Sequence, residues 1–470
     1  MSFSSPIFLF VFLPVTILSV YMIRDELRNI LLLGVSILFY WYGQGSFILP
    51  LIGSILLNYI IGLAIESLKN RHMVCKIVFI IGVISNVIML YVFKYLNFTI
   101  DIINKAGRKN ISALNIILPI GLSFFTFKAI SYLADIYMGK SGTEKNLFNF
   151  ALYISFFPQI MSGPIARYSD FKDDLVKRKF NIDEISIGVE RFICGLGKKL
   201  ILSNTFAVVA DKAFSSVGSP ELTVCLSWLG SVFYTLQIYF DFSGYSDMAI
   251  GIGNMIGFRC KENFDYPYIS KTGTEFWRRW HISLSSWFRD YVYFPLGGSR
   301  VDRKYRLFIN LSAVWLLTGI WHGANWTFII WGIFWLVIQV IEKFILHPEK
   351  FIHMYSKIIY RIITLLLINF GWVIFRSADL NAAAVYIKTM LGWNRVVFAN
   401  ALDIFLLRDN FVILVIGFIL STPIMTIVCR RGRDNLVFKV VEAAVLTGLF
   451  LVCISYSISV TYNPFIYFDF

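Results

Sequence analysis

Hydrophobic residues lie along this chain in long uninterrupted runs, and short segments between the runs carry most of the charges. A helix needs about 20 apolar residues to cross the roughly 30 Å hydrocarbon core of a bilayer, and many of these runs approach or exceed that length. We therefore predict an all-α polytopic membrane protein with roughly ten to twelve transmembrane helices. The expected spans are 7–23, 29–42, 47–68, 77–92, 118–137, 148–161, 187–210, 222–240, 307–338, 358–374, 411–428 and 440–460.

The composition agrees with this pattern, since 57% of the residues are hydrophobic and only 15% are charged. The net charge of +14 would suggest a nucleic-acid partner in a soluble protein. Here the lysines and arginines gather in short loops, so orientation and contact with anionic membrane lipids explain them, and no nucleic acid is expected. The six cysteines show no metal-binding or CxxC spacing, which predicts free thiols and no metal site.

The distribution of basic residues also predicts orientation. Arg24 and Arg28 follow the first span, and Arg430, Arg431 and Arg433 precede the last one, so both termini are expected on the external side of the membrane. We predict one membrane domain over 1–470, with N-terminal spans in 1–115, a catalytic core in 116–345, C-terminal spans in 346–463 and an external aromatic tail at 464–470. Segments 163–180 and 264–306 alternate charged and aromatic residues, which predicts helices lying at the membrane surface.

His322 is the strongest candidate for chemistry, because ionisable groups are costly at membrane depth and are rarely kept there without a role. Gly319 and Gly323 flank it, so a ligand or another backbone can approach the imidazole. Asn325, three residues further on, is expected on the same helical face, where it would orient the ring or polarise a carbonyl group. A buried histidine satisfied by a neighbouring helix is the alternative. His72, His347 and His353 lie in polar loops and are expected to be solvated.

A second histidine, His281, follows Trp277-Arg278-Arg279-Trp280. Arg278 and Arg279 are suited to hold a phosphate group of an acyl donor, although binding of lipid phosphates explains the same residues equally well. Trp277, Trp280 and, next to His322, Trp321 complete the predicted substrate-binding set.

Two carboxylates, Asp241 and Asp247, lie in a segment near membrane depth. We expect them to be structural and to pair with arginines of segment 264–306, because a charge in the membrane needs a partner.

Several strings resemble the membrane-bound O-acyltransferase family, in particular its bacterial alginate O-acetylase branch. They are 118–124, 157–165, 237–247, 262–264 with 266–268, 276–298 and 318–326. The resemblance implies a ring of helices around a central funnel, with His322 at the position of the family's main histidine and His281 at that of the second. It further implies a cytoplasmic thioester donor (acetyl-CoA or an acyl-carrier protein), no permanently bound cofactor, and an extracytoplasmic partner of the SGNH-hydrolase type.

The C-terminal segment 465–470 resembles the C-terminal motif of a small membrane peptide that serves teichoic acid D-alanylation. By this resemblance Tyr467 receives or positions the acyl group; a plain anchor at the membrane surface is the alternative.

The sequence thus predicts an acyltransferase that moves an acetyl group across the membrane for O-acetylation of an extracellular polysaccharide or cell-wall glycan. D-alanyl or other acyl transfer to a teichoic acid-like polymer is one alternative. Acylation of a lipid or a protein, and a non-catalytic transporter or channel on the same scaffold, are the others.

Overall fold

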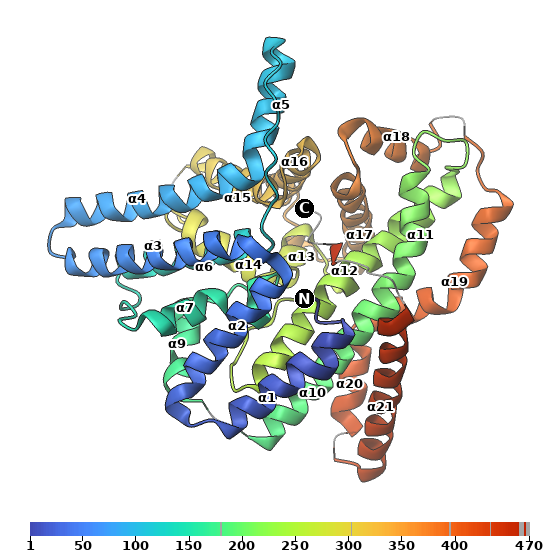
Figure 1. Cartoon of the computed structure of the whole chain (residues 1–470). Helices are drawn as coiled ribbons and strands as arrows, with labels where there is room; N and C mark the ends of the chain where they lie inside the picture. Colours follow the sequence, from blue (N-terminus) through green and yellow to red (C-terminus); the bar gives the residue numbers. More distant parts are fainter. Residues whose placement is uncertain (179–180, 302, 394–395, 433, 460–464, 467–470) are drawn as a thin grey trace. The chain divides into compact units, whose positions relative to one another are not determined.

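The computed structural model describes residues 1–470 apart from 179–180, 302, 394–395, 433, 460–464 and 467–470. Every regular element in the described ranges is a helix, which confirms the predicted all-α class (Figure 1). The chain divides into two compact units, Met1–Phe192 with Tyr245–Lys261, and Ile193–Gly244 with Glu262–Phe470. Two long helices, α10 (Ile182–Gly197) and α12 (Val224–Met255), run from one unit into the other.

In the first unit, α3 and α4 form an antiparallel hairpin on which α6 packs (Figure 1). Asn58 and Asn86 are buried between the two hairpin helices and exchange amide hydrogen bonds of 3.2 and 2.7 Å, so each pays for the other's desolvation. The elements are η1 (Phe8–Phe12), α1 (Leu13–Met22), η2 (Asp25–Leu27), α2 (Arg28–Gln44), η3 (Gly45–Phe47), α3 (Ile48–Ser67), α4 (His72–Leu90), η4 (Tyr91–Tyr95), α5 (Leu96–Gly107), α6 (Leu122–Tyr137), α7 (Leu147–Ser155), α8 (Phe157–Ile160) and α9 (Tyr168–Val176).

In the second unit, α15, α16 and α17 pack in sequence, and the short helix α13 packs against α16 and α17. This unit holds both candidate histidines. Its elements are η5 (Lys198–Ser203), α11 (Asn204–Ser215), η6 (Pro267–Ile269), α13 (Gly273–Arg279), α14 (Ile282–Phe288), η7 (Arg289–Tyr293), α15 (Lys304–His322), α16 (Trp326–Ile341), η8 (Glu342–Leu346), η9 (Pro348–Lys350), α17 (Met354–Arg376), α18 (Leu380–Met390), α19 (Ala401–Leu420), α20 (Ile424–Gly432) and α21 (Leu436–Ser459).

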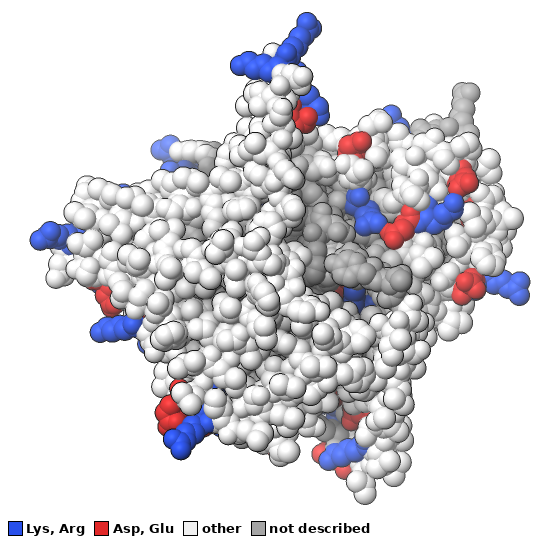
Figure 2. Space-filling view, viewed as in Figure 1, with Lys and Arg blue, Asp and Glu red and all other residues white. Residues whose placement is uncertain are grey.

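The described residues contain six helical segments long and apolar enough to cross a membrane, or seven if the pair α19 and α20, bent by 67°, is one span. They are Asp25–Ser67, His72–Gly107, Ile182–Ser215, Trp326–Leu346, Met354–Arg376 and Leu436–Ser459. The predicted number of ten to twelve is therefore not confirmed. Figure 2 shows that few side chains on one face are charged and that these stand in separate groups, as the segregated sequence pattern predicts.

The largest departure from the predicted spans falls at His322. The expected single span 307–338 is two helices, because α15 ends at His322 and Asn325 caps a new helix by accepting a 3.1 Å hydrogen bond from the amide of Thr327. A Cβ atom on Gly319 would lie 2.6 Å from the carbonyl oxygen of Phe328, so only glycine allows α15 and α16 to approach this closely. The histidine thus ends a helix inside a tight hairpin.

Candidate functional site

His322 is buried, with 6% of its surface exposed, in a cage of aromatic rings. Its ring centroid lies 4.9 Å from that of Trp331, 5.0 Å from Phe375 and 4.9 Å from Trp321. The predicted close approach at the flanking glycines is observed, and the approaching groups belong to α16. These rings keep water away from the faces of the imidazole that they cover.

His281 is 1% exposed and is held by hydrogen bonds. Its Nδ1 lies 3.1 Å from Oδ1 of Asn263, which also accepts from the amide of Ser283 at 3.1 Å and its hydroxyl at 2.9 Å. The backbone N–H can only donate, so this amide atom is an oxygen and Nδ1 must carry the imidazole proton. The neutral ring therefore has its lone pair on Nε2.

Two further features mark His281 as a specialised position. Its backbone has φ 45° and ψ 55°, a left-handed conformation that is uncommon for a residue with a side chain and that often accompanies functional sites. Burial lowers the pKa of the imidazole from 6.5 to about 3, because the charged form is poorly solvated. His281 is therefore neutral at pH 7 and can accept a hydrogen bond through Nε2.

Trp321 contacts both imidazoles, with ring centroids 6.1 Å from His281 and 4.9 Å from His322. The family resemblance implies that these two histidines, about forty positions apart in the chain, act together, and the shared indole places them in the same aromatic core. Trp321 is itself buried, with the hydrogen-bonded imidazole of His281 on one side and the imidazole of His322 on the other.

The helix that precedes His281 is fixed at its N-terminus by a residue that sequence analysis missed. The buried carboxylate of Glu342 accepts hydrogen bonds from the amides of Gly273 and Thr274, at 2.6 and 2.8 Å, and from the Thr274 hydroxyl at 2.6 Å. The Tyr360 hydroxyl donates a fourth, at 3.0 Å. A carboxylate is favoured here by the unpaired amides and the positive end of the α13 dipole. Glu342 thereby ties α13 to the end of α16.

Trp277 and Trp280, predicted at a membrane surface, are buried instead. The ring of Trp277 lies 5.1–5.3 Å from those of Trp315, Trp331 and Trp335, and Trp280 lies 4.7 Å from Trp372. The prediction of a position at the membrane surface is wrong for these two side chains, because they pack among the aromatic rings of α15, α16 and α17. Each such pair contributes about 0.5–1.5 kcal/mol beyond burial.

The two neighbouring arginines differ. Arg279 donates to Glu275 at 3.0 Å and to the carboxylate of Asp265 at 2.6 Å, so its guanidinium serves the local structure. Arg278 is exposed, and its positive charge interacts with that of Lys343 at the start of η8. Two exposed cations whose charges interact are a suitable place for a phosphate group. Of the predicted pair, Arg278 is thus the better candidate for the donor site, and Lys343 joins it.

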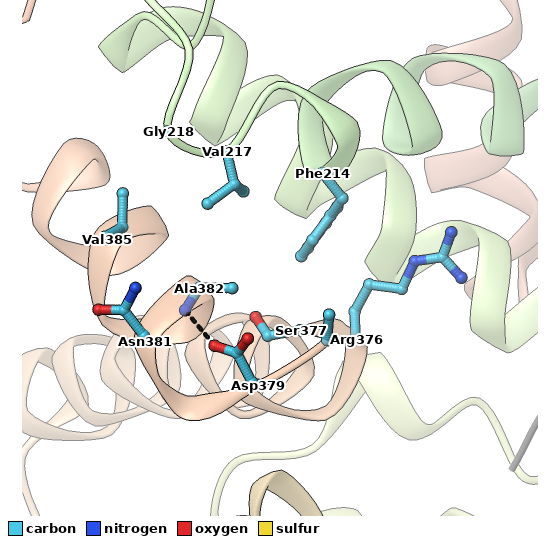
Figure 3. Close-up of a pocket in the computed structure, with 10 residues that line it drawn as sticks. Phe214, Val217, Gly218, Arg376, Ser377, Asp379, Asn381, Ala382 and Val385 are labelled. Atoms are coloured by element: carbon cyan, nitrogen blue, oxygen red, sulfur yellow. Dashed lines mark hydrogen bonds between the residues drawn. The ribbon is translucent and has the colours of Figure 1, made fainter.

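We predicted that Asn325 lies on the same helical face as His322. This prediction is wrong, because α15 ends at His322 and Asn325 lies outside it. Its Oδ1 caps α16, and its Nδ2 donates to the carbonyl of Ala378 at 2.8 Å. Ala378 lines a cavity of about 490 Å³ at the ends of α11, α17 and α18. Figure 3 shows Phe214, Arg376 and Asp379 around this cavity, with Asp379 capping α18 through the amide of Ala382. Asn325 therefore connects the His322 hairpin to the wall of the cavity.

The two carboxylates of α12 pair with cations, as predicted, but the partners differ from those expected. Asp241 forms a buried ion pair of 2.6 Å with Lys199 of η5, and Asp247 pairs with Arg191 of α10 at 2.9 Å. The prediction of arginines from segment 264–306 is wrong because α10 and η5 pack along α12. Tyr467 lies outside the described residues, whereas its neighbours Phe465 and Ile466 are described and buried.

These observations define a helical protein with a buried two-imidazole centre and apolar segments suited to a membrane. The profile of the membrane-bound O-acyltransferase family matches residues 140–383, more than half of the chain. The chain belongs to this family, and it is a multi-pass membrane protein and an acyltransferase. Both histidines lie within the matched residues.

Three relatives show which branch is near. The chain is 43% identical over 390 residues to the probable alginate O-acetylase AlgI of Pseudomonas syringae pv. tomato, covering 82% of this chain and 74% of the relative. It is 35% identical over 429 residues to the peptidoglycan O-acetyltransferase of Helicobacter pylori, covering 84% and 80%. The teichoic acid D-alanyltransferase of Bacillus subtilis is 31% identical over 281 residues, covering 56% and 69%. The similarity thus favours O-acetyl transfer over D-alanyl transfer, and enzymes over a transporter.

Proposed function

We propose that this chain transfers an acetyl group from a cytoplasmic thioester, across a bacterial cytoplasmic membrane, for O-acetylation of an extracellular polysaccharide or cell-wall glycan. The observation that carries the proposal is the placement of two buried imidazoles against one indole, that of Trp321. The names of the Pseudomonas and Helicobacter relatives support the acetyl group and the glycan acceptor.

His322 is proposed as the base. Its imidazole takes the proton of an acceptor hydroxyl while the oxygen attacks the thioester carbonyl carbon. The C–S bond of the resulting tetrahedral intermediate then breaks, and the imidazolium returns the proton to the departing thiolate. His281 assists as a neutral hydrogen-bond acceptor through Nε2, since its Nδ1 proton is directed to Asn263.

The donor is proposed to bind at Arg278 and Lys343. Both side chains are exposed and close enough for their charges to interact, and a phosphate group of acetyl-CoA or of an acyl-carrier protein would neutralise them. By the positive-inside rule this end of α16, with Lys343, Lys350 and Lys357 following in sequence, is cytoplasmic. The same rule puts both termini outside, where an SGNH-hydrolase-type partner would receive the acetyl group.

The catalytic assignment is tested by His322→Ala. We expect glycan acetylation to fall about 10²- to 10⁴-fold, the range for loss of an acid–base group, while the protein still inserts into membranes. His353→Ala is the matched control, because His353 is exposed. Acetyl content is measured on purified glycan from cells that carry only the variant, and a near-normal content with His322→Ala would refute the assignment.

Tyr467 is proposed to carry or position the acetyl group between the imidazoles and the partner. Support comes from its chain neighbours, since Phe465 and Ile466 are buried against the second unit. A phenol oxygen can accept an acyl group once a base removes its proton. Tyr467→Phe keeps the ring and removes the hydroxyl, and it should abolish acetylation of the glycan. Full acetylation by this variant, measured in the same assay, would leave the segment as an anchor or plug.

A further inference from the structure

The buried carboxylate of Asp241 lies where three parts of the second unit meet. Its Oδ1 accepts from Nζ of Lys199 at 2.6 Å and from the hydroxyl of Ser203 at 3.2 Å. Its Oδ2 accepts from the main-chain amide of Ile466 at 2.8 Å. The side chains of Asp241 and Lys199 are 1% and 6% exposed, so both charges are buried and the carboxylate needs these hydrogen-bond donors.

Close helix packing brings the pair together. A Cβ atom on Gly244 would lie 2.8 Å from the carbonyl oxygen of Gly195, so glycine is required where α12 meets the end of α10. This approach places Lys199, in the following η5, opposite Asp241 on α12. The lysine satisfies one carboxylate oxygen and leaves the other directed at the C-terminal segment.

The contact at Ile466 also joins that segment to the imidazole centre. The ring of Phe465 lies 5.8 Å from that of Phe242, the residue after Asp241, and Phe242 lies 4.6 Å from the ring of His281. Because the contact uses the main-chain amide, it fixes the position of residue 466 relative to Asp241 without depending on the side chain at 466. The residue directly after Ile466 is Tyr467.

We propose that Asp241, held by Lys199, is the receptor for the C-terminal segment and a positioning residue for acyl transfer. Its carboxylate binds the Ile466 amide and so holds Phe465 and Ile466 next to Phe242, whose ring contacts His281. The function of this contact in acyl transfer rests on the proposed role of Tyr467. The hydrogen bond between Asp241 and the Ile466 amide is independent of that role. Loss of the contact should lower kcat and leave the KM for the thioester unchanged, because the donor is proposed to bind at Arg278 and Lys343.

Two variants remove the contact from opposite sides. Ile466→Pro eliminates the amide hydrogen and leaves the ion pair intact. The double variant Lys199→Met with Asp241→Leu replaces the pair by apolar groups of similar size, a change that buried pairs often tolerate. Ile466→Val retains the amide and should keep the segment bound. Arg191→Met with Asp247→Leu is a matched control that removes another ion pair on α12.

The readouts are hydrogen–deuterium exchange of the C-terminal peptide, without substrate, and steady-state kinetics. We expect both contact-removing variants to exchange faster and to lose about tenfold or more in kcat, the loss expected for a hydrogen bond to a charged group. The control pair should leave the exchange of the C-terminal peptide slow. If the double variant fails to fold, Ile466→Pro decides alone.

Unchanged exchange in Ile466→Pro would overturn the contact, and faster exchange with a wild-type kcat would overturn its role in transfer. Failure of the Tyr467 proposal is a separate result, since Tyr467→Phe would then acetylate fully while the exchange measurement still detects the bound segment.

Discussion

The surroundings of His281 and His322 differ in kind, although Trp321 contacts both rings. Hydrogen bonds to Asn263 hold His281 and determine which nitrogen carries the proton. Aromatic rings from α16 and α17 pack against the imidazole of His322, with ring centroids 4.9 and 5.0 Å away. A proton-transfer group must exchange its proton in each cycle, whereas a hydrogen-bonding group must keep one form. The difference supports the proposed division of roles, with proton transfer at His322 and orientation or polarisation at His281.

The largest effect on kcat that tests the difference between the two histidines is expected from substitution of Asn263. Asn263→Leu removes the acceptor of the Nδ1 proton, so the imidazole of His281 loses its fixed tautomer, and kcat should fall about 10²-fold. Asn263→Asp keeps an oxygen acceptor and should restore most of the rate. The wild-type kcat should also show no titration of His281 between pH 5 and 8, because burial lowers the pKa of this group to about 3.

The measurement is a pH–rate profile of each variant, together with its melting temperature. A purely structural Asn263 would give destabilised protein in both variants and a normal kcat for the fraction that stays folded. That result would remove the proposed distinction between the two histidines.

The apolar pattern of the sequence predicted the helical class, and a physical argument singled out His322 as a candidate for chemistry. An ionisable residue within an apolar run is rare enough to be noticed in one dimension, which is how His322 was found. The break after His322 was not predicted, since the apolar pattern of 307–338 continues without interruption across two helices. An apolar pattern indicates which residues are buried. A single span and a tight helical hairpin would both bury these residues, so the pattern cannot distinguish them.

Glu342 could have been found by the reasoning that found His322. It is an acidic residue close to the end of the apolar run that begins at Trp326, yet the run looked complete before it. The partners of Asp241, by contrast, depend on packing between α12 and η5, which no local pattern encodes. The burial of Trp277 and Trp280 was missed for a similar reason, because tryptophan next to arginine suits a membrane surface and an aromatic core equally well.

A smaller effect should come from the support of the His281 side. Glu342→Gln removes the charge that four donors surround, and we expect a loss of about 1–3 kcal/mol in stability with a lower kcat, because α13 and His281 lose their fixed position. Glu349→Gln, at an exposed position nearby, is the control. Thermal melting in detergent checks the first effect and acetylation the second; equal melting of the two variants would show that the cap does not hold α13.

The smallest effects are expected from substitution of Arg278 and Arg279, the two arginines that precede His281. Arg278→Gln should raise the KM for the thioester about three- to tenfold without changing stability, since an exposed cation gives about 1 kcal/mol to a phosphate contact. Arg279→Gln should leave KM unchanged and lower stability by about 1 kcal/mol or less, because its ion pairs with Glu275 and Asp265 are partly exposed. Lys343→Gln should resemble Arg278→Gln, because both cations are proposed to face the same phosphate.

Donor titrations in membrane vesicles separate the outcomes. If Arg279→Gln raised KM and Arg278→Gln did not, the donor would bind on the Asp265 side of α13, and the ion pairs of Arg279 would have to open to admit it.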